Sequence, residues 1–212
     1  MRRHDLAWIR PQSWRRGLGG YAADTLVREW ATCNRPLVKR RSLAGEPAGV
    51  SLGLPTPPAD GKRRLVFLFP LEAIDRVMRP PTLADSLSTL PLSWHCTAAR
   101  ISLLGEQHAV TMRVFGSAAF QLLTGLDFLT PASDLDLLIE IGPETDLVGL
   151  AADLTTIAQR APMRLDGEFM GPDGAACKWR EIGRDSDPVL IRTADGLSLG
   201  PSNSILSGGA GI

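Results

Sequence analysis

The sequence predicts a two-domain α+β protein. A small basic α/β domain over residues 1–80 precedes a larger domain over residues 81–203, in which helices flank a mixed sheet. Strand-like and helix-like segments alternate along the second part, with the apolar periodicity of each changing accordingly. The two parts meet at Arg79-Pro80-Pro81-Thr82, where two prolines interrupt the pattern and Thr82 can cap a new helix.

The net charge of zero hides a division between these parts. Residues 1–80 carry 15 Lys and Arg against 7 Asp and Glu, whereas residues 81–212 carry 8 against 16. A charge asymmetry of this size indicates separate roles, and polyphosphates, phosphorylated coenzymes, nucleic acids or acidic proteins suit the basic part. The alternative is that the two parts attract each other and their charges are solvated surface.

Five segments can be distinguished in the sequence of the basic part. A helix is expected over Asp24–Thr32, a short strand from Leu37–Lys39 and a buried strand over Leu65–Phe69, which follows the Pro- and Gly-rich segment Gly53–Gly61. Glu72–Met78 is expected to form one or two helical turns.

The second part alternates more regularly. Helices are expected over Ser93–Leu104, stopped by Gly105, over Ala118–Thr124, and over 147–158, where one apolar face includes Val148 and Pro162 ends the helix. Strands are expected over Thr111–Phe115, Ser133–Ile139, Met163–Met170, Ala175–Arg180 and Val189–Thr193. Residues 204–212, rich in Ser and Gly, are expected to be a disordered tail.

Several classes of protein are excluded by composition. No apolar run approaches the roughly 18–20 residues that span a membrane, and the N-terminus lacks the apolar stretch of a signal peptide. Cys33, Cys96 and Cys177 are odd in number and widely spaced, which supports neither a disulfide framework nor a zinc site. Reduced, semi-buried thiols and a cytoplasmic location are therefore expected.

The most informative residues lie in the middle of the chain. Gly116 and Ser117 follow the strand expected at Thr111–Phe115, and Ser117 can cap the next helix. Asp134 and Asp136 begin a later strand, where residues i and i+2 share a face roughly 6.5–7 Å apart. Leu135 and Leu137 then turn inward, and the two carboxylates can hold metal ions together.

A third acidic element follows at Asp166 and Glu168, which share one face of their strand. If that strand pairs beside Asp134–Ile139, one of them can join the first two carboxylates. Three carboxylates can hold two Mg²⁺ ions, which suit oxygen ligands and substrate phosphates. Gly116 allows close backbone approach, so that the amides at Gly116-Ser117 can meet terminal phosphates at a helix N-terminus.

Each of these motifs alone is a weak indication of function. Together they follow one another along a strand, a helix, a second strand and a later acidic strand, and this order indicates a metal-dependent nucleotidyltransferase domain. The structural alternative is a capped helix beside a solvated acidic sheet edge. Lys178 and Arg180 alternate on the strand expected at Ala175–Arg180, where they either meet the triphosphate or form a solvated edge.

The central segments Arg113–Gln121 and Leu129–Leu138 resemble the phosphoribosyl-dephospho-CoA transferase of malonate decarboxylase systems, also called malonate decarboxylase holo-acyl-carrier-protein synthase. The resemblance covers nearly the whole chain except the tail. It extends to Arg3–Leu6 with Trp8, Pro36–Val38 with Arg40-Arg41, Gly53–Pro55, Arg164–Glu168, Asp173–Ala176 and Trp179–Glu181.

This resemblance implies transfer of a phosphoribosyl-dephospho-CoA group from 2′-(5″-triphosphoribosyl)-3′-dephospho-CoA to a serine of the apo acyl-carrier subunit, with release of pyrophosphate. Asp134 and Asp136 match the family's metal-binding catalytic pair. We take Asp166 as the third carboxylate, with Glu168 in reserve.

The basic N-terminal part is expected to dock the carrier or the CoA phosphates, and neither a membrane nor a nucleic acid is the expected partner. Two alternatives remain at this point. One is a general nucleotidyltransferase that moves AMP onto a protein or small molecule. The other is a non-catalytic nucleotide- or RNA-binding module.

Overall fold

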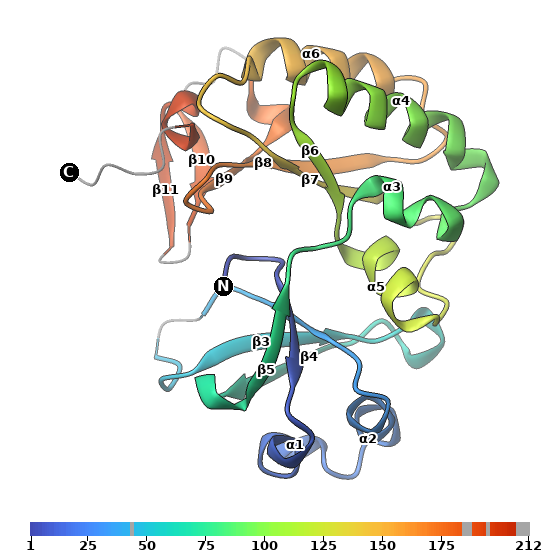
Figure 1. The fold of residues 1–212 in the computed structure, drawn as a ribbon, viewed down its shortest axis with the longest axis vertical. Coiled ribbons are helices and arrows are strands. Elements are labelled where there is room, and N and C mark those ends of the chain that lie inside the picture. The colour runs from blue at the N-terminus through green and yellow to red at the C-terminus, as the bar shows by residue number, and fades with distance from the viewer. Residues whose placement is uncertain (43–44, 184–187, 194–195, 207–212) are drawn as a thin grey trace. The chain divides into compact units, whose positions relative to one another are not determined.

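The computed structural model describes residues 1–42, 45–183, 188–193 and 196–206 (Figure 1). The chain divides into two compact units. The N-terminal unit holds residues 1–80 together with Leu123–Phe128, and the C-terminal unit holds Pro81–Leu122 and the chain from Leu129 onward. No helix among the described residues is long and apolar enough to cross a bilayer.

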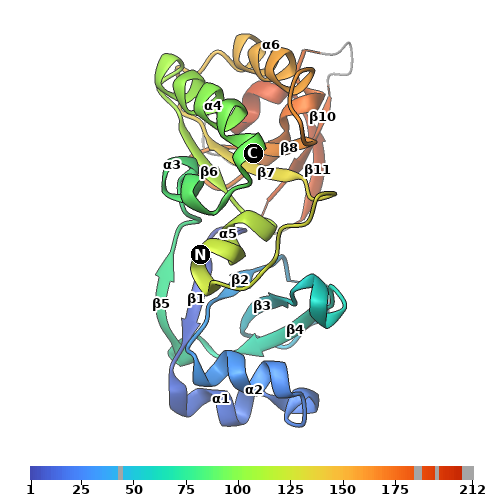
Figure 2. The same cartoon turned by 90° about the vertical axis from the view of Figure 1, so that its right-hand side faces the viewer.

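The described residues of the N-terminal unit form a five-stranded antiparallel sheet in the order β4-β3-β2-β1-β5 (Figure 2). Its strands are β1 (Leu6–Ile9), β2 (Leu37–Lys39), β3 (Val50–Pro55), β4 (Arg64–Phe69) and β5 (Ile74–Met78), and its helices are α1 (Pro11–Gly17) and α2 (Thr25–Thr32). The Asp24 carboxylate caps α2 by accepting a hydrogen bond from the Val27 amide. Trp14 of α1 packs edge-on against Phe67 and Phe69 of β4, which fixes that helix on the sheet.

One expectation for this unit is wrong. Glu72–Met78 is not helical, because a short 3₁₀ turn ends at Ala73 and β5 then pairs with β1, Met78 lying opposite Leu6. The Pro- and Gly-rich segment begins inside β3, where Gly53 lies between Val38 and Val66 of the neighbouring strands. Pairing on both sides outweighs the weak strand propensity of its residues.

The described C-terminal unit builds a six-stranded mixed sheet in the order β11-β10-β9-β8-β7-β6, which confirms the predicted α+β class. Its strands are β6 (Thr111–Val114), β7 (Leu135–Glu140), β8 (Leu165–Met170), β9 (Ala176–Lys178), β10 (Val189–Arg192) and β11 (Leu197–Gly200). β7 and β8 run parallel, and the other neighbours are antiparallel. A parallel pair needs a crossover, which α6 supplies.

The helices of this unit are α3 (Leu83–Ser86), α4 (His95–Gln107), α5 (Gly116–Thr124) and α6 (Leu147–Ala158). Figures 1 and 2 show α4 and α6 side by side over one face of the sheet. Leu150 and Leu154 of α6 are completely buried together with Leu137 of β7, so this layer forms the main apolar core.

Short 3₁₀ helices link several elements. They cover Gly19–Tyr21, Pro58–Asp60, Leu71–Ala73, Leu87–Thr89, Leu92–Trp94, Trp179–Glu181 and Ser202–Ile205.

Some local expectations for the C-terminal unit are corrected by packing. Gly105 does not stop α4 but lies buried inside it, where an added Cβ would be 2.9 Å from Cγ of Met112. Val148 is exposed rather than part of the buried face of α6. The three cysteines are free, but Cys33 and Cys96 are exposed and Cys177 is buried.

The disordered tail was predicted to start at residue 204, which is too early in the chain. Ile205 is completely buried in the 3₁₀ helix Ser202–Ile205, and residues 204–206 therefore belong to the folded unit. This apolar contact outweighs the Ser- and Gly-rich composition that predicted disorder. The rest of the predicted tail, residues 207–212, lies outside the described residues.

Gly171 packs closely against the 3₁₀ helix Ser202–Ile205, and its substitution tests this packing. An added Cβ would lie 1.9 Å from the carbonyl oxygen of Ile205, a backbone atom that cannot swing aside. Gly171→Ala is expected to lower the free energy of unfolding by about 1–3 kcal/mol, measured by urea denaturation. Gly142→Ala, where nothing lies within 4 Å of the added Cβ, is the control. Equal stability of the two variants would contradict the packing.

Candidate functional site

The parallel pairing of β7 and β8 sets the position of the acidic residues. Asp136 of β7 lies opposite Asp166 of β8, and Leu138 lies opposite Glu168. Asp134 directly precedes β7 rather than lying within it. Leu135 is completely buried while Asp136 is half-buried, as the alternation in the sequence predicts. Three carboxylates therefore gather where these two strands begin.

Gly116 lies directly against this acidic edge. Its φ of 62° is in the left-handed region, and an added Cβ would lie 2.3 Å from Oδ2 of Asp136. A larger residue would meet both strained backbone and a steric clash. The Phe115 amide also donates a hydrogen bond to the Asp136 carbonyl oxygen at 3.1 Å, which ties the turn to β7.

The role expected for Ser117 as a helix cap is wrong. The helix α5 already begins at Gly116, so Ser117 lies in its first turn instead of preceding it. The helix thus begins two residues earlier than the sequence pattern predicted, at a glycine with positive φ. The N-terminal end of α5, with its partial positive charge, thus lies beside the Asp136 carboxylate.

Asp136 is electrostatically unusual. Burial raises its pKa to about 6, and the neighbouring Asp166 and Asp134 carboxylates add to the rise, whereas Lys178 and Arg164 act against it. Its negative charge is therefore costly in the free protein. A group with this pKa still carries its charge at neutral pH and can accept a proton.

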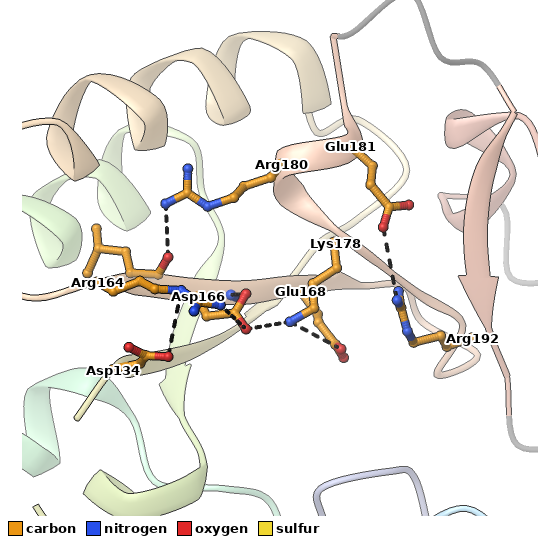
Figure 3. Close-up of polar contacts among 10 residues, drawn as sticks. Asp134, Arg164, Asp166, Glu168, Lys178, Arg180, Glu181 and Arg192 are labelled. Atoms are coloured by element: carbon orange, nitrogen blue, oxygen red, sulfur yellow. Dashed lines mark hydrogen bonds and ion pairs between the residues drawn. The ribbon is translucent and has the colours of Figure 1, made fainter. Parts of the chain in front are cut away.

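Asp166 is stabilised as an anion. Burial acts to raise its pKa, but the hydrogen bond and charge of Lys178, with the Gly167 amide and Arg164, lower it overall. Lys178 Nζ lies 2.7 Å from Asp166 Oδ2 and 4.0 Å from Glu168 Oε1, as Figure 3 shows. Lys178 therefore lies at the edge where the sequence placed it, and its neighbours there are two carboxylates of the same sheet.

Arg164 also lies at this edge, although the sequence motifs did not single it out as a site residue. Its Nε atom is 3.7 Å from Asp134 Oδ2, and a terminal nitrogen is 3.8 Å from Asp166 Oδ2 (Figure 3). The signal in the sequence was its spacing: Arg164 precedes Asp166 by two residues, the interval that places strand side chains on one face.

The expectation that Arg180 alternates with Lys178 on one strand is wrong. β9 ends at Lys178, and Trp179–Glu181 form a 3₁₀ turn. The Arg180 guanidinium stacks 4.2 Å from the Trp179 ring centroid and donates a hydrogen bond to the Leu165 carbonyl oxygen at 3.0 Å. These contacts brace the start of β8, one residue before Asp166.

Within the described ranges, no group of three or more His, Cys, Asp or Glu side chains converges on a common metal position. The carboxylates of Asp134 and Asp166 are instead directed toward the nearby cations Arg164 and Lys178. The donor atoms nevertheless have the chemistry that Mg²⁺ prefers. The pKa of Asp136 is raised by burial first and then by the Asp166 and Asp134 carboxylates, and a cation would stabilise its charge.

Comparison with known proteins identifies the family. Residues 2–80 match the model of the phosphoribosyl-dephospho-CoA transferase MdcG N-terminal domain, and residues 82–203 match that of the C-terminal domain. No solved structure matches the chain significantly.

Curated relatives span both domains. A phosphoribosyl-dephospho-CoA transferase of Bradyrhizobium diazoefficiens is 41% identical over 212 residues, covering 99% of this chain and 94% of the relative. One of Xanthomonas campestris pv. campestris (strain 8004) is 34% identical over 207 residues, covering 96% and 95%. One of Pseudomonas aeruginosa is 32% identical over 158 residues, covering 69% and 70%. The chain therefore belongs to the phosphoribosyl-dephospho-CoA transferase family.

Proposed function

We propose that this chain transfers the phosphoribosyl-dephospho-CoA group from 2′-(5″-triphosphoribosyl)-3′-dephospho-CoA to a serine of the apo acyl-carrier subunit of malonate decarboxylase. The family supplies the reaction. One observation assigns this reaction to a site. The Gly116 turn lies beside Asp134, Asp136 and Asp166 at one edge of a mixed sheet. We take this arrangement as a nucleotidyltransferase-type catalytic domain.

The reaction exchanges a phosphoanhydride bond of the donor for a phosphate ester bond to serine. The serine Oγ attacks the α-phosphorus of the donor's triphosphate, and the bond from that phosphorus to the oxygen bridging to the β-phosphate breaks. A phosphodiester to serine forms and pyrophosphate leaves with the electron pair. A serine hydroxyl is a weak nucleophile until its proton is taken up. A bound metal that lowers the pKa of the hydroxyl, or a neighbouring carboxylate that accepts its proton, would supply this activation.

We propose Mg²⁺ as the cofactor, held by Asp134, Asp136 and Asp166. Glu168 is a weaker candidate, since its side chain is almost completely buried and its position in β8 is opposite Leu138. When bound, the metal would neutralise the crowded carboxylates and offset charge on the transferring phosphates. Lys178 keeps Asp166 in its anionic form through a 2.7 Å contact, and thereby preserves it as a ligand.

The basic N-terminal unit is proposed to dock the carrier or the donor, and the structure limits which of the neighbouring Lys39, Arg40 and Arg41 suit that role. Arg40 forms an ion pair with Glu46, and Lys39 is half-buried, with a pKa lowered by burial and by Arg40. Reversing both charges would disturb the fold. Arg41 is exposed, so Arg41→Glu should raise KM for the carrier or the donor about 3- to 10-fold with little change in kcat, since it removes one exposed charge. Unchanged KM values for both would remove Arg41 from the docking surface.

Intact-mass analysis tests the proposed function directly. The apo carrier subunit is incubated with this chain, Mg²⁺ and the triphosphoribosyl donor, with ATP as a parallel donor and EDTA as a control for each. A mass gain equal to phosphoribosyl-dephospho-CoA, with pyrophosphate release that EDTA abolishes, is expected. A gain of AMP alone would identify a general nucleotidyltransferase. No gain from the folded protein with either donor would contradict the proposal and favour a binding module.

The choice of third carboxylate predicts different outcomes at two positions. Asp166→Ala is expected to lower kcat about 100-fold or more, because a ligand to catalytic metal contributes several kcal/mol. Glu168→Ala is expected to reduce stability, since this carboxylate is buried beside Lys178, and to keep most of kcat. Steady-state kinetics and urea denaturation separate the effects. Near-normal kcat in Asp166→Ala with loss in Glu168→Ala would reverse the assignment.

Asp136 is expected to trade stability for activity. Its folded pKa of about 6 exceeds the unfolded value of 3.8, so the folded state binds this proton more tightly. This contribution to stability is present below about pH 4 and lost as the pH rises through 6, up to about 3 kcal/mol. Asp136→Asn should therefore raise the free energy of unfolding at pH 7.5 by about 1–3 kcal/mol, show no gain at pH 4, and abolish transfer.

Urea denaturation of the metal-free protein at both pH values measures this effect, with the exposed Asp127→Asn as control. An Asp136→Asn protein that is less stable than the unsubstituted protein at pH 7.5 would disprove the charge crowding.

A further inference from the structure

Two cations lie at the acidic edge, and they are held in different ways. Lys178 is partly buried, with 27% of its side chain exposed, and its Nζ lies 2.7 Å from Asp166. Arg164 is 68% exposed, and its two carboxylate neighbours lie at 3.7 and 3.8 Å, beyond hydrogen-bond distance. Lys178 is thus a fixed partner of Asp166, while Arg164 is attracted to the edge as a whole.

The backbone of Arg164 is nevertheless firmly placed. Its carbonyl oxygen accepts a hydrogen bond from the Leu135 amide at 2.9 Å, and the next carbonyl, that of Leu165, accepts one from Arg180. A fixed backbone with an exposed side chain lets the guanidinium turn about its own stem without disturbing the sheet. Exposed ion pairs contribute about 0–1 kcal/mol, so little stability is lost when it turns away.

Beside the proposed Mg²⁺, a cation of the protein in this position assists the approach of the donor. A triphosphate must approach an edge that carries Asp134, Asp136 and Asp166, and like charges repel it. Lys178 is directed toward Asp166 and Glu168. Arg164 lies at the same edge with its side chain largely exposed, is permanently charged, and presents a planar fork that matches two oxygens of one phosphate.

We propose that Arg164 binds the β- and γ-phosphates of the donor, the part that leaves as pyrophosphate. This inference rests on the proposed function and adds a residue for its leaving group. In the free protein the guanidinium lies 3.7 Å from Asp134 and 3.8 Å from Asp166, and in the donor complex it turns to the polyphosphate. As the bond between the α-phosphorus and the bridging oxygen breaks, the bridging oxygen gains negative charge that the guanidinium stabilises.

Calorimetric binding of inorganic pyrophosphate in the presence of Mg²⁺ tests this role without turnover. Arg164→Ala is expected to weaken binding about 10- to 100-fold, the worth of a charge-assisted bidentate contact. Arg164→Lys, which keeps the charge but loses the fork, should recover part of that loss. Arg100→Ala, which removes an exposed arginine on α4, should bind as the unsubstituted protein does. Arg164→Gln, which keeps the stem, replaces the alanine variant if that variant fails to fold.

Steady-state kinetics with the donor supply a second readout. Arg164→Ala should raise KM for the donor and also lower kcat, because the charge on the leaving group grows in the transition state. Pyrophosphate affinity within twofold of the unsubstituted protein would overturn the inference, as would an equal loss in Arg100→Ala.

The two proposals fail separately. If the unsubstituted protein transfers no group yet binds pyrophosphate in an Arg164-dependent manner, the proposed acceptor or donor is wrong and the polyphosphate-binding role of Arg164 stands. If transfer proceeds normally and Arg164→Ala binds pyrophosphate as tightly as the unsubstituted protein, the role of Arg164 is wrong and the function stands.

Discussion

The parallel pairing of β7 and β8 is the constraint on which the site depends. Parallel neighbours bring the same ends of two strands together, so residues far apart in the chain begin side by side. Asp136 consequently faces Asp166 across the pair, and Asp134 lies just before them. Had β8 run antiparallel to β7, the acidic starts of these strands would lie at opposite edges. The crossover through α6 is therefore a condition for the chemistry as well as a layer of the core.

The fold accommodates this crowding of charge with a few specific contacts. Lys178 stabilises Asp166 as an anion, whereas Asp136 is left with a pKa of about 6 because burial and two carboxylates oppose its charge. Gly116 approaches the same carboxylate more closely than any side chain would allow. Strain of this kind, placed at one edge of a well-packed sheet, is typical of functional sites. The apolar layer formed by α4, α6 and the sheet supplies the stability that the edge lacks.

The charge division between the two units can be followed to individual side chains. Several N-terminal cations are already used within their own unit: Arg79 contacts Asp5, Arg63 contacts Asp24, and Arg40 contacts Glu46. The net charge of +8 (15 minus 7) already subtracts these three acids, so the exposure of individual cations, rather than this count, decides which of them a partner can reach. Among neighbouring basic residues, exposure selects Arg41 over Lys39 and Arg40 as a contact for phosphates or an acidic carrier. Family membership spans both units, so both belong to the transferase.

The sequence by itself determined the α+β class, the alternation of elements after residue 81, and the order of a glycine turn and two acidic strands. These are local properties of periodicity, turn residues and spacing, which act before any long-range contact forms. It failed where neighbours override local preference, as in β5, the buried Ile205 and the turn that holds Arg180. The tertiary structure alone decided the parallel register that pairs Asp136 with Asp166, the start of α5 at Gly116, and the place of Arg164. Those depend on which strands become neighbours, and strand pairing is set by burial and hydrogen bonding across the whole sheet.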